Sequence, residues 1–159
     1  MREILFRGKA TNRIEGRPYR TNYKNGDWVF GLLTDVLNYA GFSEMTNTNG
    51  VSGIEVDPET VGQFTGKTAR NGVKIFEGDI VKAKVIQNTG SEVRKYTEVY
   101  VVAYHPKFCY FYLKREGNNL LFDGNWAYGV FIEEVIGNIH DNPELLTKNS
   151  AIDSPLAKP

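Results

Sequence analysis

The chain has 159 residues, with 19 basic and 19 acidic side chains and a formal net charge of zero. This balance argues against a general polyanion binder, although it is compatible with a local basic patch. The single cysteine, Cys109, excludes an intrachain disulfide and fits a reducing compartment. No apolar run reaches the length of a membrane span and no signal sequence opens the chain, so we expect a soluble, cytoplasmic protein.

The first sixty residues show short strand patterns and few helical ones. Residues 2–9 alternate as a strand does, and residues 28–33 form an apolar segment after a turn. Residues 34–42 fit either a short helix or a continued strand. Pro58 predicts a helical turn at residues 57–60. These patterns predict a small β-rich part over residues 1–60.

From residue 61 onward, short strands alternate with tight turns. Val81, Ala83 and Val85 would share one face of a strand. Turns are indicated at Gly78-Asp79, His105-Pro106-Lys107 and Asp123-Gly124-Asn125. We therefore predict a mainly β (β-rich α+β) protein whose residues 75–139 close into a small barrel of the Src-homology-3 type. The expected parts are a barrel domain over residues 61–146 and a disordered tail over residues 147–159.

Two stretches alternate short apolar runs with residues that tolerate positive φ. The first is Glu-Thr-Val-Gly-Gln-Phe-Thr-Gly (59–66), followed by Asn-Gly (71–72) and Glu-Gly-Asp-Ile-Val (77–81). The second is Val-Ile-Gly-Asn-Ile (135–139), ending in Asn-Pro-Glu-Leu-Leu (142–146). Together with Met-Arg-Glu-Ile-Leu-Phe-Arg (1–7), these motifs resemble the YopX family. That resemblance implies a bacteriophage or prophage protein of the bacterial host cytoplasm, and the family offers no established activity to transfer.

The segment from Gly62 to Thr68 is similar to a phosphate-binding loop. It is one residue short between its glycines, and the pair Asn71-Gly72 would break the helix that must follow such a loop. We interpret the segment as a structural turn. ATP or GTP with magnesium should therefore leave the melting temperature unchanged.

The candidate metal ligands are His105, Cys109 and His140. Both histidines lie at turns, and the three residues do not supply the four ligands of a structural zinc site. Cys109 lies among alternating strand residues, which favours a small buried apolar side chain over a nucleophile. We expect no metal and no cofactor.

Paired carboxylates are the remaining candidates for catalysis. Glu77 and Asp79 flank a glycine turn, where capping explains them. Glu133 and Glu134 are adjacent, so their side chains diverge and would not share a proton. No catalytic set for acid–base work is visible, and we expect a protein that is not an enzyme.

The strongest functional signal is a concentration of aromatic residues between positions 96 and 112. If residues 93–104 form a strand, its tyrosines share one face with Glu98 and Val102. The opposite face carries Thr97, Val99, Val101 and Ala103, and we expect this aliphatic face to be inward. Tyrosine is enriched in protein interfaces. With the nearby lysines the same face could stack nucleotide bases, and strand propensity alone also accounts for tyrosines. The predicted interface, for a protein partner or a second copy and alternatively for nucleic acid, comprises Tyr96, Glu98, Tyr100, Tyr104, Tyr110 and Tyr112.

Overall fold

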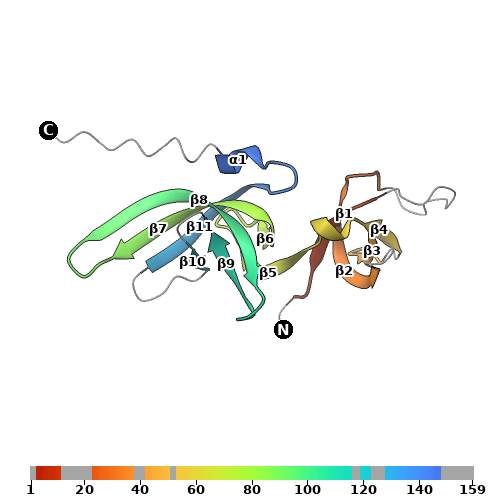
Figure 1. Cartoon of the computed structure of the whole chain (residues 1–159), viewed down its shortest axis with the longest axis horizontal. Coiled ribbons are helices and arrows are strands. Elements are labelled where there is room, and N and C mark those ends of the chain that lie inside the picture. Colours follow the sequence, from red (N-terminus) through yellow and green to blue (C-terminus); the bar gives the residue numbers. More distant parts are fainter. Residues whose placement is uncertain are drawn as a thin grey trace. The chain divides into compact units, whose positions relative to one another are not determined.

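The structure is a computed structural model that describes residues 3–11, 23–37, 42–50, 53–115, 119–122 and 128–147. Strands dominate these residues (Figure 1). The helical elements among them are a 3-10 turn, Pro58–Thr60, and the short helix α1, Glu144–Thr147. The mainly β class and the helical turn at Pro58 are therefore confirmed. The predicted turn at residues 123–125 and residues 148–159 of the predicted tail lie outside the described residues.

The chain divides into two compact units, Met1–Gly66 and Lys67–Pro159. The boundary predicted from sequence lay between residues 60 and 61. Strand β5, Gly62–Thr68, runs across the observed boundary. Its first residues pair with β1, Phe6–Lys9. After Thr68 the chain turns back into β6, Lys74–Phe76, and the Ala69 amide donates to the Val73 carbonyl.

The sheet of the first unit curls so that the segment after its first strand meets the strand at one end of the sheet. The strands of this unit are β1 (Phe6–Lys9), β2 (Trp28–Leu37), β3 (Phe42–Asn47) and β4 (Ile54–Val56). With β5 and β6 they form a six-stranded sheet in the order β4-β3-β2-β1-β5-β6, in which β6 comes after the unit boundary. Thus residues 34–37 continue a strand. Ala10, just after β1, forms an isolated bridge with Val56 of β4, and the Thr11 amide donates to the Glu55 carbonyl at 2.9 Å. The enclosed core comprises Ala10, Val29, Met45, Ile54 and Val56.

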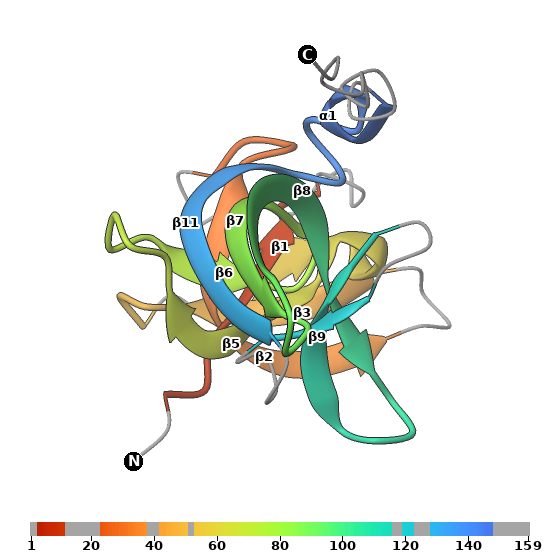
Figure 2. The same ribbon diagram turned by 90° about the vertical axis from the view of Figure 1, so that its left-hand side faces the viewer.

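The second unit contains an open antiparallel sheet. Its strands are β7 (Asp79–Asn88), β8 (Val93–His105), β9 (Tyr110–Lys114), β10 (Leu120–Leu121) and β11 (Tyr128–Asn138), in the order β10-β9-β8-β7-β11. Figure 2 shows β11, β7 and β8 curving side by side.

The predicted closed barrel is therefore wrong for this region. Closure would require the two end strands to pair with matched length and stagger. At one end, β10 has only two residues. At the other, β11 shifts register between Ile132 and Glu134 and again between Val135 and Gly137. Its Ile132 carbonyl accepts the Arg70 amide at 3.1 Å instead of a partner on β10.

The two family-like motifs form turns that hold this sheet. Gly78 has φ +80°, which suits glycine, and the fully buried Asp79 accepts the Phe76 amide through Oδ2 at 2.7 Å. The predicted turn role of both residues is confirmed. In the second motif, a Cβ on Gly137 would lie 2.5 Å from Oδ1 of Asn142, so only glycine fits there without displacing the turn. Both motifs thus have a structural explanation.

Candidate interaction surface

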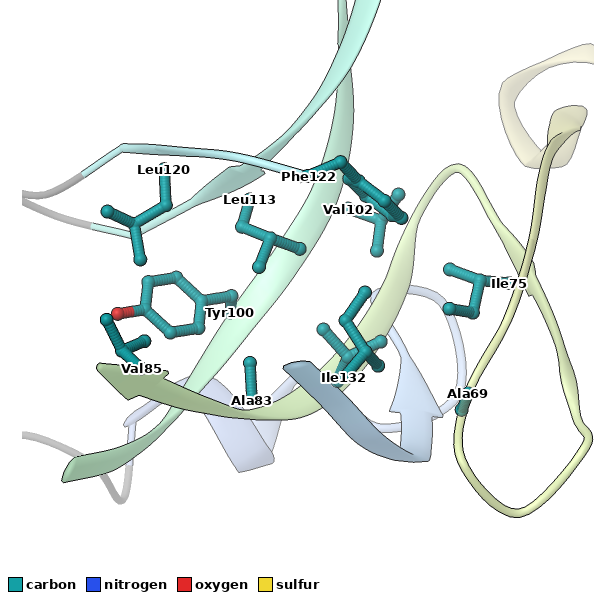
Figure 3. Close-up of a cluster of buried hydrophobic side chains, with 11 residues drawn as sticks. Ala69, Ile75, Ala83, Val85, Tyr100, Val102, Leu113, Leu120, Phe122 and Ile132 are labelled. Atoms are coloured by element: carbon teal, nitrogen blue, oxygen red, sulfur yellow. The ribbon is translucent and has the colours of Figure 1, made fainter. Parts of the chain in front are cut away.

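Strand β8 presents Tyr100 to the core. The relative exposure of Tyr100 is 0% and that of Val102 is 1%, and Figure 3 shows the Tyr100 ring among Val85, Leu113 and Leu120. The register gives the reason. Tyr100 lies directly opposite Val81, and directly opposed residues on antiparallel strands share a face. The face that Val81, Ala83 and Val85 share is fully buried, so the expectation that Tyr100 points outward is wrong.

The Tyr100 hydroxyl ends in a small polar network. It donates to Oε2 of Glu98 at 2.8 Å, and the Arg115 guanidinium pairs with the other carboxylate oxygen. Burial raises the pKa of Tyr100 far above its ordinary value, and the hydrogen bond to the Glu98 carboxylate adds to this. The phenol therefore stays neutral and donates its proton, which makes Tyr100 a structural residue.

The six predicted interface residues do not form one surface. Opposed residues show that Tyr100 and Tyr104 lie on the inward face of the sheet, whereas Tyr110 and Tyr112 lie on the outer face. Tyr96 also faces inward and packs partly buried against the core. Of the six, only Tyr110 and Tyr112 thus lie on the outer face.

The outer face of the β8–β9 hairpin ends in a group of four rings, which we call the aromatic tip. Its members are His105, Phe108, Tyr110 and Tyr112. The His105 ring centroid lies 4.8 Å from that of Phe108 and 5.5 Å from that of Tyr110. Phe108 and Tyr110 stack at 6.2 Å with an angle of 13° between their planes. Phe108 is 60% exposed and Tyr110 37%, so the rings contact one another and still face solvent.

The turn between β8 and β9 positions these rings. The amides of Phe108 and Cys109 donate to the His105 carbonyl at 3.3 and 2.8 Å, which confirms the predicted turn. Cys109 has φ +54°, in the left-handed region that few non-glycine residues adopt. This conformation continues the turn and leaves the thiol exposed, so the expected burial of Cys109 is wrong. The Nζ atom of Lys107 lies 5.5 Å from the Phe108 ring centroid.

Sequence reasoning omitted His105 and Phe108 from the interface. The turn signal at Pro106 could have identified them, because side chains at the end of a hairpin have few neighbours to cover them. The missing information was the register, which pairs His105 with Tyr110 and thereby places the two rings on the same face.

The other candidate sites stay dispersed. His105 and Cys109 lie at the hairpin end, whereas His140 follows β11. Within the described ranges, no group of three or more His, Cys, Asp or Glu side chains could hold a metal ion. The phosphate-loop-like segment lies in β5, so the turn expected there is misplaced; it follows at Arg70 and Asn71. In the part of the chain that the structure describes, no helix is long and apolar enough to cross a bilayer.

A comparison of the sequence with protein families gives a match over most of the chain. A family model described as YopX protein matches residues 13–147, which include both turn motifs and the aromatic tip. Neither a curated protein nor a solved structure matches the chain significantly. Because the matched range covers most of its length, the chain belongs to the YopX family.

Proposed function

We propose that this protein is a non-enzymatic accessory protein of phage or prophage origin that acts through protein contacts at its aromatic tip. The partner is a second copy of the chain or a protein of the bacterial host. The observation that carries the proposal is the exposure of Phe108 and Tyr110, two stacked rings at the end of a hairpin. Aromatic side chains dominate the binding energy of many protein interfaces.

The geometry of the tip favours a contact surface for a further reason. Ring-to-ring contacts hold His105, Phe108 and Tyr110 in place before any partner arrives. Side chains that are already ordered lose less conformational entropy on binding. An exposed and preorganised aromatic group is therefore well suited to enter a pocket on another protein.

Cys109 allows a direct test, because it is the only cysteine and it is exposed at the tip. The purified protein carrying benzophenone on Cys109 would be irradiated alone and with lysate of the bacterial host. We expect one dominant adduct, either a dimer of the chain or a single host protein. The adduct should disappear when Phe108→Ser and Tyr110→Ser are introduced together.

A matched control moves the label away from the tip. Cys109→Ser combined with Lys24→Cys places the benzophenone on an exposed turn of the first unit. This protein should give no dominant adduct. Equal adducts from both labelled positions, or an adduct that survives the two serine substitutions, would contradict the proposal.

A further inference from the structure

The zero net charge of the chain conceals an uneven distribution of lysines on the outer face of the second sheet. Register places three lysines there, because Lys84 lies opposite Thr97, Lys82 opposite Val99, and Lys95 opposite Ile86. The alternating residues Val81, Ala83 and Val85 of β7 are fully buried on the other face. We call the outer surface formed by Lys82, Lys84, Lys95, Thr97 and Phe131 the lysine face.

Few carboxylates balance the lysine face. Glu134 lies opposite Lys82, and its Oε1 is 3.6 Å from the lysine Nζ. Glu133 lies beside it at the register shift in β11. No ion pair joins Lys84 or Lys95 to another of the described residues. The face therefore carries a local positive surplus that a count over the whole chain cannot reveal.

An exposed aromatic ring lies among these lysines. Phe131 is directly opposite Lys84 on β11 and is 48% exposed. A Cβ built on Gly129 would lie 3.3 Å from the Phe131 ring, so the glycine leaves the ring uncrowded on that side. Phe131 of β11, Lys84 of β7 and Thr97 of β8 therefore lie side by side in one row across three strands.

We infer that the lysine face binds single-stranded nucleic acid. Sheet surfaces that combine cationic side chains with exposed rings bind single strands by phosphate attraction and base stacking. Lysine is depleted in protein interfaces, which makes a protein partner a poorer match for this face. The described residues contain no helix long enough to enter a duplex groove, and the face belongs to a five-stranded sheet, which is wider than the two-stranded ribbon that a major groove admits. Paired bases also do not offer their ring faces.

The lysine face is separate from the aromatic tip. Thr97 and His105 are both on β8, eight residues apart. At the rise of a β-strand this corresponds to roughly 26 Å. Substitutions at one surface therefore leave the other intact, and the two proposals can fail independently.

The test measures the fluorescence anisotropy of a labelled mixed-sequence oligonucleotide as the purified protein is added. Three forms of the oligonucleotide are compared: single-stranded DNA, single-stranded RNA and the matching duplex. We expect the purified protein to bind at least one single strand more tightly than the duplex, and the affinity to fall as salt rises. Phe131→Ala should weaken binding roughly 5- to 150-fold, the range for loss of one stacked base. Lys84→Glu and Lys95→Glu should each weaken it at least about tenfold and reduce the salt dependence.

Two controls keep the result interpretable. Lys24→Glu changes the net charge by the same amount in the first unit and should retain wild-type affinity. Phe108→Ser at the tip should retain it as well. A melting curve for each variant shows whether it still folds. If Lys84→Glu does not fold, Lys95→Glu tests the same face at a second position. The inference is overturned by no binding at low salt, by equal or tighter binding of the duplex, or by equal losses in Lys24→Glu and Lys84→Glu.

Discussion

The base and the tip of the β8–β9 hairpin use the same residue types for different purposes. At the base, Tyr100 is fully buried in the core on the inward face of the sheet, and its hydroxyl donates a hydrogen bond to Glu98. At the tip, Tyr110 has a similar aromatic side chain but remains exposed beside Phe108. The difference shows that a tyrosine-rich strand cannot be assigned to core or surface by composition. Whether a tyrosine lies in the core or on the surface depends on the residue opposite it on the neighbouring strand.

The largest expected effect separates the two tyrosines directly. Tyr100→Ala should lower the free energy of unfolding by about 3 to 5 kcal/mol, because it empties a fully buried aromatic position. Tyr110→Ala should change it by less than about 0.5 kcal/mol. Urea denaturation followed by circular dichroism measures both values. Similar losses for the two variants would remove the distinction between base and tip.

A smaller effect is expected from the polar network at the base. Glu98→Ala leaves the buried Tyr100 hydroxyl without its acceptor and should cost about 1 to 3 kcal/mol. Glu98→Gln keeps an acceptor for the hydroxyl and loses only the charge that faces Arg115, so it should cost less. Denaturation of both variants tests this order. If Gln were as costly as Ala, the Tyr100 hydrogen bond would contribute little.

Alkaline pH should reveal the buried phenol. The pKa of Tyr100 is raised in the folded protein, whereas an unfolded tyrosine ionises near pH 10. Its stabilising contribution is therefore fully present below about pH 10 and is lost as pH rises toward the folded pKa. Unfolding free energies measured from about pH 8 to about pH 11 should fall less steeply for Tyr100→Phe than for the wild type. Identical slopes would show that Tyr100 is not shielded from solvent.

The smallest expected effect on stability is at the tip. Phe108→Ser should change the free energy of unfolding by no more than about 0.5 kcal/mol, because most of the ring faces solvent. The same substitution should abolish cross-linking only when combined with Tyr110→Ser, if the two stacked rings act together. A marked drop in melting temperature for Phe108→Ser alone would show that the tip belongs to the folded core.

Local sequence patterns predicted the strands and turns. They could not predict which face of a strand is buried or whether the sheet closes, because both depend on how strands pair. The alternation of β7 and the turn at Gly78 and Asp79 could be read directly, because each depends on neighbours in sequence. The faces of β8 could not, since Tyr100 and Val101 are both suited to a core and only the register with β7 distinguishes them. Barrel closure failed for the same reason: it depends on how the end strands meet.

The candidate surfaces were predicted less well than the fold. Tyr110 and Tyr112 were identified, but Phe108 and His105 were omitted, because their contacts form across a turn whose geometry the sequence only outlines. The lysines near the tyrosines were noted in the sequence, but their grouping with Phe131 was not predicted, because Phe131 and Lys84 are far apart in sequence and meet only through β11 and β7. A chain-wide charge of zero gave no sign that lysines gather on one side.

The two register shifts in β11 have a consequence for pairing between copies of the chain at this edge. A long, regular strand at the end of a sheet offers unpaired backbone groups that can template the addition of further copies. β11 has 11 residues, yet its ladder is interrupted twice, and the Arg70 amide already occupies the Ile132 carbonyl. A second molecule cannot extend the sheet along it in an unbroken register. The same irregularities that keep the sheet from closing therefore also make this edge a poor template for edge-to-edge association.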